Sequence, residues 1–364
     1  MTRPTLREVL SGLRAEAHLG PDAEARARSA LEVHQRTAVA TPWFVKALAG
    51  FGAWVAAGFL LSFLGCVGLL NEEAVMLIVG LALCGGSTAL RRRVQGAFPE
   101  QLALALCLAG AGMTTFGFGK ATESATGAAA VLLVLSAALL AVFPDAILRF
   151  LATLGMASAA VFLLGDGLGP LGIDLGMLAL TALLHFLFLR LARLRAGRWA
   201  EQVGPAAFAL ACGLPVTLLL RGVPHAIGMM PDWGIPTPTG LLTLGLTAVT
   251  LYTAWQVMRE LELDASGMAG VAVFAALVLT ALLTLHTPAV IAAVGMMVLG
   301  FHRRSPLLLG LAIAFLLVAG GWYYYDLGLT LLAKALALAG SGLVFLGLRL
   351  FLLRRFPAAA AEVR

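Results

Sequence analysis

The chain contains about twelve apolar segments, each close to the roughly 20 residues that a helix needs to cross a lipid bilayer. Short polar gaps separate these segments, and most arginines of the apolar region lie in every second gap. Hydrophobic residues make up 60% of the sequence and charged residues only 12%, against about 25% charged residues in soluble domains. The sequence therefore predicts an all-α fold, a polytopic transmembrane helical bundle of about twelve spans.

The predicted bundle occupies residues 43–356, between a cytoplasmic helical segment over residues 1–42 and a short cytoplasmic tail over residues 357–364. We expect the first apolar run to be retained as a span, because it is too long for a signal peptide and lacks a cleavage site. The predicted spans cover residues 47–70, 73–90, 101–119, 124–143, 145–164, 170–192, 203–221, 238–258, 267–286, 287–302, 305–324 and 328–352.

The basic residues predict an orientation. The clusters follow the even-numbered spans at residues 91–93, 190–198, 303–304 and 349–355. The other gaps hold only Lys120 and Arg221, together with several acidic residues. Because short cytoplasmic loops carry the excess of Lys and Arg, both termini are expected in the cytoplasm. The net charge of +6 is then a topology signal, and we expect no nucleic-acid partner.

Motifs that carry catalytic or metal chemistry are missing from the sequence. No Walker loop, His-Glu-x-x-His, Gly-x-Ser-x-Gly or Cys-x-x-Cys motif occurs. The Gly-x-Gly-x-x-Gly string at residues 167–172 joins two predicted spans and lacks the βαβ unit that binds a dinucleotide. The four cysteines fall in apolar runs without paired spacing. We therefore expect no enzymatic activity, no catalytic residue, no cofactor and no metal site.

A charge at membrane depth is costly and marks a candidate site. Lys334 lies about six residues into the last predicted span, some 9 Å from its outer end. It is either the counter-ion of an anionic substrate or of an acid on another helix, or a lysine that snorkels to the outer headgroups. Asp326 cannot reach it along one helix, since eight residues rise about 12 Å.

Two further features complete the candidate ligand-binding residues, which are Lys334, Asp326, Trp322, Tyr325 and His185. The run from Trp322 to Asp326 is predicted as the turn between the last two spans, where it forms either an outer vestibule for a cation or sugar, or an interfacial aromatic belt. His185 is either a proton relay or a neutral residue hydrogen-bonded to a backbone or hydroxyl group near the cytoplasmic end of its span.

Two acidic residues near helix starts are predicted to have structural roles. Asp145 is expected to cap the helix that follows it and to pair with Arg149, four residues later. Asp174 is expected to favour the positive end of its helix dipole.

Short strings at both ends of the bundle resemble the bacterial family called domain of unknown function 4401. They are Thr41-Pro42-Trp43-Phe44 with Gly50-Phe51-Gly52-Ala53-Trp54, and Trp322-Tyr323-Tyr324-Tyr325-Asp326-Leu327 with Leu329-Thr330-Leu331-Leu332-Ala333-Lys334. The resemblance implies a polytopic inner-membrane protein without an assigned activity. It also implies a partner, a small membrane protein with a Gly-Asp-Tyr-x-x-Leu-x-x-x-Pro signature. The chain departs from the family at one position. A typical member has a serine after the lysine that corresponds to Lys334, whereas this chain has Ala335, so a role for a hydroxyl there does not carry over.

Two functions remain open. The first is a non-enzymatic membrane component that acts with a partner protein, which the polar-poor spans and the segment over residues 1–42 favour. The second is a secondary transporter of a small solute with a site near Lys334. Twelve spans with a basic loop midway would allow two six-span halves, although the sequence shows no clear internal repeat.

Overall fold

The predicted apolar runs are helices in the computed structural model, which describes residues 43–68, 71–94, 96–197, 199–221, 239–326 and 346. The described residues contain no strand. The helices are α3 (Trp43–Cys66), α4 (Glu73–Arg93), α5 (Ala97–Thr122), α6 (Ala125–Val142), α7 (Ala146–Leu168), α8 (Pro170–Arg195), α9 (Ala200–Arg221), α10 (Thr239–Glu260), α11 (Met268–Leu283), α12 (Pro288–His302) and α13 (Pro306–Asp326).

Eleven of the predicted spans thus coincide with helices. Eight of these helices, α3 to α10, are long and apolar enough to cross a membrane, which supports a multi-pass membrane protein. The last three contain shorter apolar stretches. The twelfth predicted span, residues 328–352, and the predicted segments 1–42 and 357–364 lie outside the described residues, except for Leu346.

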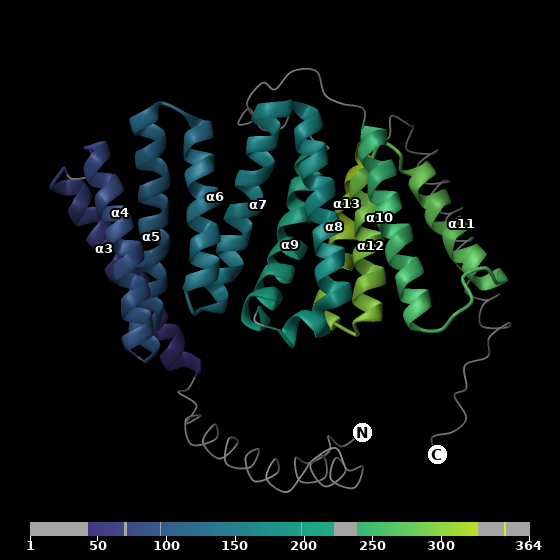
Figure 1. Cartoon of the computed structure of the whole chain (residues 1–364), viewed down its shortest axis with the longest axis horizontal. Coiled ribbons are helices and arrows are strands. Elements are labelled where there is room, and N and C mark those ends of the chain that lie inside the picture. The colour runs from purple at the N-terminus through teal and green to yellow at the C-terminus, as the bar shows by residue number, and fades with distance from the viewer. Residues whose placement is uncertain are drawn as a thin grey trace, which may run out of the picture.

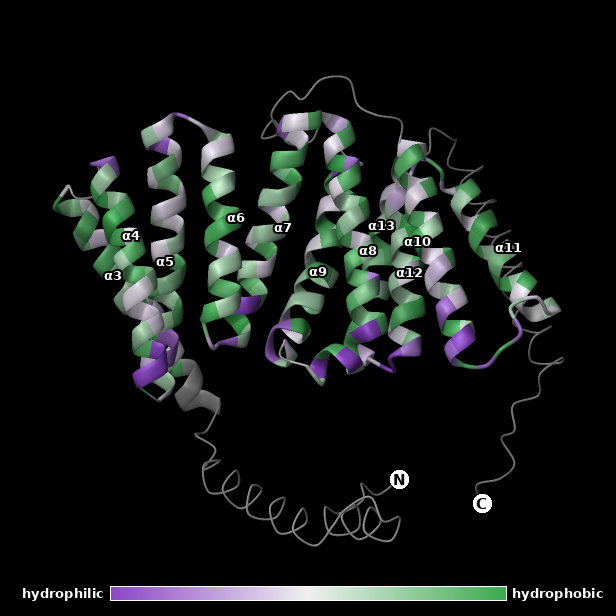
Figure 2. Ribbon diagram, in the orientation of Figure 1, coloured by the Kyte–Doolittle hydropathy of each residue, from purple (hydrophilic) through white to green (hydrophobic). Residues whose placement is uncertain are grey.

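Consecutive helices run in alternating directions, so the connections fall at two ends of the molecule (Figure 1). At one end lie the C-terminal turns of α4, α8, α10 and α12. We call this end the arginine face, and it carries Arg91, Arg92, Arg93, Arg193, Arg195, Arg259, Arg303 and Arg304. The hydrophilic patches of the ribbon gather along the same edge, while the middle of the helices is hydrophobic (Figure 2). The other end, the opposite face, carries Lys120 and Arg221.

The first five helices form a row. In this row α5 packs against α3, α4 and α6, and α7 packs against α6 (Figure 1). In the most apolar part of α3 and of α6, only 11% of the residues are buried inside the protein. The apolar sides of these helices are therefore exposed, as expected for helices that face lipid or another membrane protein.

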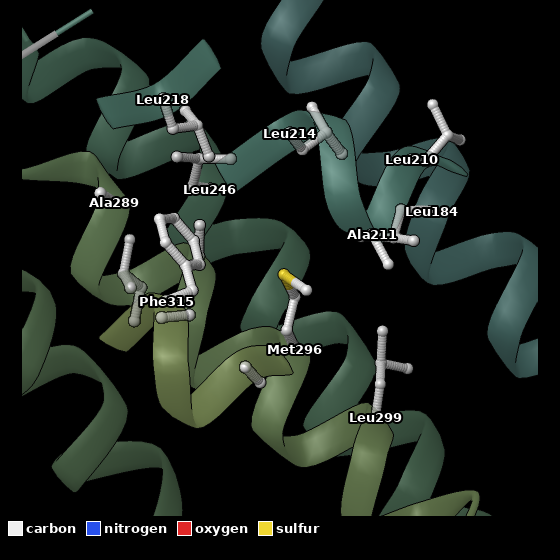
Figure 3. Packing of buried hydrophobic residues seen from close by; sticks show 14 of the residues in the cluster. Leu184, Leu210, Ala211, Leu214, Leu218, Leu246, Ala289, Met296, Leu299 and Phe315 are labelled. Atoms are coloured by element: carbon white, nitrogen blue, oxygen red, sulfur yellow. The ribbon is translucent and has the colours of Figure 1, made fainter. Parts of the chain in front are cut away.

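The remaining helices form a bundle around α12. This short helix packs against α8, α9, α10, α11 and α13, and most of its residues are buried. Leu184 from α8, Leu214 from α9, Leu246 from α10 and Met296 from α12 contribute to one hydrophobic core (Figure 3). The shortest predicted span, 287–302, is thus the central helix of the bundle.

Close helix packing in the row depends on glycine. A Cβ atom added to Gly110 of α5 would lie 2.6 Å from the carbonyl oxygen of Gly80 and 3.0 Å from the amide nitrogen of Cys84, both on α4. A Cβ added to Gly80 would lie 2.8 Å from the carbonyl oxygen of Gly110. The backbones of α4 and α5 therefore touch, an arrangement that small residues permit between membrane helices.

Candidate functional site

A stripe of threonines runs along the buried side of α10. The stripe consists of Thr243, Thr247, Thr250 and Thr253, all buried. The hydroxyls of Thr247, Thr250 and Thr253 each donate a hydrogen bond to a carbonyl four residues earlier in the same helix, over 2.6 to 2.9 Å. The Thr243 hydroxyl lies 2.7 Å from the Leu285 carbonyl and 3.1 Å from the Thr239 carbonyl. Threonine makes this bond readily in a helix interior, because it satisfies the hydroxyl hydrogen where water is excluded. The oxygen lone pairs then remain available to accept from neighbouring helices.

His185 of α8 uses one of these lone pairs. It lies 15 residues after Pro170, about 22 Å along α8 and about 15 Å before Arg195, so it sits in the middle third of the helix. Its Nδ1 atom is 2.6 Å from Oγ1 of Thr253. Because the Thr253 hydroxyl already donates its hydrogen to the Val249 carbonyl, the hydrogen-bond network assigns the donor role to Nδ1. The neutral ring then carries its hydrogen on Nδ1, and Nε2 is an acceptor.

The Nε2 atom of His185 is buried, and no described residue donates a hydrogen bond to it. It lies beside Gly295 of α12, where an added Cβ would be 2.9 Å from Cε1 and 3.3 Å from Nε2 of the histidine. The same Cβ would be 2.8 Å from Oγ1 of Thr250. Gly295 thus provides the space for the imidazole between three helices. We call His185, Thr250, Thr253 and Gly295 the histidine site.

A cavity of about 300 Å³ continues from His185 toward the arginine face. Its polar lining consists of His185, Arg190, Tyr252, Gln256 and Glu260. The Gln256 amide donates to the Tyr252 hydroxyl over 3.0 Å, and the Glu260 carboxylate lies 2.8 Å from Nε2 of His302. The volume is at the lower end of small-molecule sites. The buried Nε2 atom beside Gly295 suits a proton, water or a small hydrogen-bond donor, whereas the cavity is lined by residues of α8 and α10.

The structure describes the other candidate ligand-binding residues only in part. Trp322 is exposed in the last turns of α13, near the opposite face. Asp326 ends that helix, whereas the side chains of Tyr325 and Asp326, and all of Lys334, lie outside the described residues. The prediction of a turn from Trp322 to Asp326 is wrong, because α13 continues to Asp326. Of the two candidates whose side chains are described, His185 belongs to the histidine site and Trp322 does not.

A buried ion pair joins α8 and α9 near the opposite face. Arg221 Nε donates to Asp174 Oδ1 over 2.9 Å, and Arg221 Nη2 to Oδ2 over 3.3 Å. The side chains are only 12% and 8% exposed. Asp174 was expected to act through the helix dipole, but its partner is a guanidinium that binds both carboxylate oxygens. Such bidentate pairs are the stronger class of charged hydrogen bonds.

The predicted pairing of Arg149 with Asp145 is also wrong. Asp145 caps α7, as expected, by accepting hydrogen bonds from the amides of Ile147 and Leu148 over 2.8 and 3.1 Å. Arg149 instead donates to the Phe143 carbonyl and forms an ion pair of 2.9 Å with Glu201 at the start of α9. The arginine leans toward α9, because α7 packs against that helix.

Two parts of the histidine site were missed in the sequence. The threonines were present in the predicted span 238–258 at spacings of three and four residues, a periodicity that marks one side of a helix. Gly295 carried no such signal, since glycine is frequent in membrane helices. Among the described residues, no group of three or more His, Cys, Asp or Glu side chains could hold a metal ion.

Comparison with known proteins identifies a family and nothing closer. No curated protein and no solved structure matches the chain. A family model described as Domain of unknown function (DUF4401) matches residues 42–355, which includes every described helix. The model begins one residue before α3 and covers the histidine site as well as the row. The chain therefore belongs to the DUF4401 family.

Proposed function

We propose that this protein is a non-enzymatic component of a bacterial inner membrane that acts with a partner protein bound along α3. The observation that carries the proposal is the isolation of α3 at the end of the row. Among the described helices, α3 packs extensively only against α5. Its outer side presents a stripe of large side chains, in which Phe51, Phe59 and Phe63 are 70%, 72% and 61% exposed.

Residues 1–42 support this proposal by their position in the chain. They come directly before α3, and the capping-box pattern at Thr5 to Glu8 with leucines at helical spacing is typical of an amphipathic helix. A partner that contacts both this segment and α3 would hold the protein at two points. The small membrane protein with the Gly-Asp-Tyr-x-x-Leu-x-x-x-Pro signature is the proposed partner.

Co-expression of the two proteins tests the proposal. We expect the small protein to co-purify in mild detergent, and we expect the double substitution Phe51→Ala and Phe59→Ala, or deletion of residues 1–42, to reduce its recovery. The matched control is Phe301→Ala on α12, which removes a phenylalanine that is 65% exposed far from α3 in the chain. Full-length protein that purifies without the small protein would reject the proposed pair.

The proposal includes twelve spans with both termini in the cytoplasm. It is supported by the arginine face, because described basic residues lie mainly at the exits of even-numbered spans. The measurement is labelling of intact cells with a membrane-impermeant maleimide, in a background in which exposed Cys66 is replaced by serine. We expect Glu72→Cys at the opposite face to be labelled and Glu262→Cys at the arginine face to be protected. The reverse pattern would place the termini outside.

A second candidate function, transport of a small solute or proton, is favoured by one observation. The Nε2 atom of His185 is buried in the middle third of α8 without a donor among the described residues, and His185 also lines the cavity of about 300 Å³ between α8 and α10. One observation argues against transport. If the chain consisted of two equivalent six-span halves, α4 and α6 would correspond to α10 and α12. However, α10 packs extensively on α12, whereas α4 does not pack extensively on α6. In proteoliposomes with an imposed gradient, His185→Gln should stop the flux, and Lys334→Ala tests the site expected from the sequence. No flux in the unmodified protein would reject transport.

A further inference from the structure

A cavity of about 720 Å³ lies between α5, α6 and α7, in the middle of the row. We call it the lateral groove. Its walls are formed by small and aliphatic side chains, chiefly Ala111 and Gly112 of α5, Ala128 and Leu132 of α6, and Leu151 and Gly155 of α7. Lys120, Glu123 and Ser124 line its end at the opposite face. The groove exists because these helices place small residues where they converge.

The length and lining of the lateral groove indicate its occupant. It extends along α6 from Ala125 to Leu139, about 21 Å, which is more than half of the roughly 30 Å hydrocarbon core. Water is disfavoured, because the walls are mostly apolar and apolar cavities stay dry. A single acyl chain from the surrounding leaflet fits both the length and the chemistry.

The charges at the mouth indicate the headgroup. The Lys120 ammonium donates to the Asn71 carbonyl over 3.0 Å and lies 4.0 Å from the Glu73 carboxylate, so the described contacts use part of its donor capacity. Glu123 is exposed in a left-handed backbone conformation at the end of α5, and its carboxylate makes no ion pair with any described residue. A cation and an anion three residues apart complement a headgroup that carries a phosphate and an ammonium.

We infer that the lateral groove binds one phospholipid of the phosphatidylethanolamine type, with an acyl chain between α5, α6 and α7, the phosphate at Lys120 and the primary ammonium at Glu123. A primary ammonium has three hydrogens to donate to the carboxylate, whereas the trimethylammonium of phosphatidylcholine has none, and Glu123 repels a headgroup with net negative charge. The inference goes beyond the proposed partner protein and does not depend on it, since that partner is proposed to bind along α3 and the groove is lined by α5, α6 and α7.

Native mass spectrometry of the delipidated, full-length protein tests the inference. The protein is titrated with phosphatidylethanolamine, phosphatidylcholine and phosphatidylglycerol that carry identical acyl chains. We expect one site that prefers phosphatidylethanolamine by about two- to fivefold, the range of one partly exposed ion pair. Equal affinity for the three lipids would overturn the headgroup assignment.

Two variants locate the site. Gly112→Phe should weaken binding of all three lipids by about tenfold, because a Cβ at Gly112 meets no atom within 4 Å and the ring enters the groove. The matched control is Gly86→Phe on α4, which is equally unobstructed but outside the groove and should change nothing. Glu123→Gln keeps the shape and should remove only the preference for phosphatidylethanolamine. Unchanged binding in Gly112→Phe, or an unchanged preference in Glu123→Gln, would contradict the inference.

Discussion

The row and the bundle are held together by different means, although both consist of apolar helices of similar composition. In the row, the backbones of α4 and α5 touch at Gly80 and Gly110. In the bundle, buried polar side chains join helices, as in the Asp174–Arg221 pair near the opposite face and the His185–Thr253 hydrogen bond in the middle third of α8. Because lipid tails are as apolar as the side chains, the hydrophobic effect does not drive membrane helices together, and close packing and polar contacts must stabilise their association instead. The comparison indicates that the row depends chiefly on backbone contact between α4 and α5, whereas the bundle adds polar links between helices to a hydrophobic core.

The largest expected effect concerns the ion pairs at the opposite face. Asp174→Ala leaves the Arg221 guanidinium buried without its carboxylate and should destabilise the protein by about 3 to 5 kcal/mol. The corresponding pair of the row, Lys120 with Glu73, is 4.0 Å long with side chains 45% and 42% exposed. Glu73→Ala should cost less than about 1 kcal/mol. Unfolding by SDS in mixed micelles measures both, and equal losses would contradict the distinction between the two regions.

The next effect tests the glycine contact of the row. Gly110→Ala should destabilise the protein by about 2 kcal/mol, because the added methyl group meets backbone atoms of α4 that cannot move independently. Gly112→Ala on the same helix is the matched control, since its Cβ meets no atom within 4 Å. Alanine replaces glycine in both variants and favours the helix equally, so the difference in stability between them reports the contact of Gly110 with α4. Melting curves in detergent that coincide would show that α4 and α5 do not depend on it.

A smaller effect tests the hydrogen bond between α8 and α10 inside the bundle. Thr253→Val removes the acceptor for His185 Nδ1 while it keeps the shape of the side chain, and should cost about 1 to 2 kcal/mol. Thr280→Val on α11 provides the control, because the Thr280 hydroxyl is exposed and bonds only to its own helix at Ala276. The free energy of unfolding should hardly change in the control. If both variants behave alike, the histidine site contributes nothing to packing.

The smallest effect lies in the connection between α10 and α11, on the arginine face. The side chain and backbone amide of Ser266 donate to Asp264 Oδ1 over 2.6 and 2.9 Å. These bonds lower the pKa of Asp264 below its ordinary value. The ionised carboxylate therefore stabilises the protein at pH values above the ordinary aspartate pKa. This stabilisation is lost as the pH falls through the lowered pKa of Asp264. Ser266→Ala should raise the pKa in a carboxyl NMR titration; an unchanged titration would show that the hydroxyl has no part.

Much of the fold is predictable from the sequence, whereas little of the site is. The apolar runs and alternating arginines locate eleven helices, because length and hydrophobicity decide which segments cross a bilayer. They cannot indicate which helices touch. Arg149 was assigned to the nearest acid along the chain, but it pairs with Glu201, 52 positions later, because α7 and α9 are neighbours. The partner of His185 is likewise 68 positions away, and only the packing of α8 on α10 brings them together.

The threonine stripe of α10 has a consequence for what can occupy the centre of the bundle. Every one of its hydroxyl hydrogens is already engaged with a backbone carbonyl, three within α10 and that of Thr243 between the carbonyls of Leu285 and Thr239. The stripe therefore presents a column of oxygen atoms that can receive a hydrogen but cannot give one. A group that displaces His185 from Thr253 must bring its own hydrogen, as an ammonium, an amide or a protonated imidazole does. A carboxylate or phosphate would meet only lone pairs, so the chemistry of α10 selects against anions before any net charge is considered.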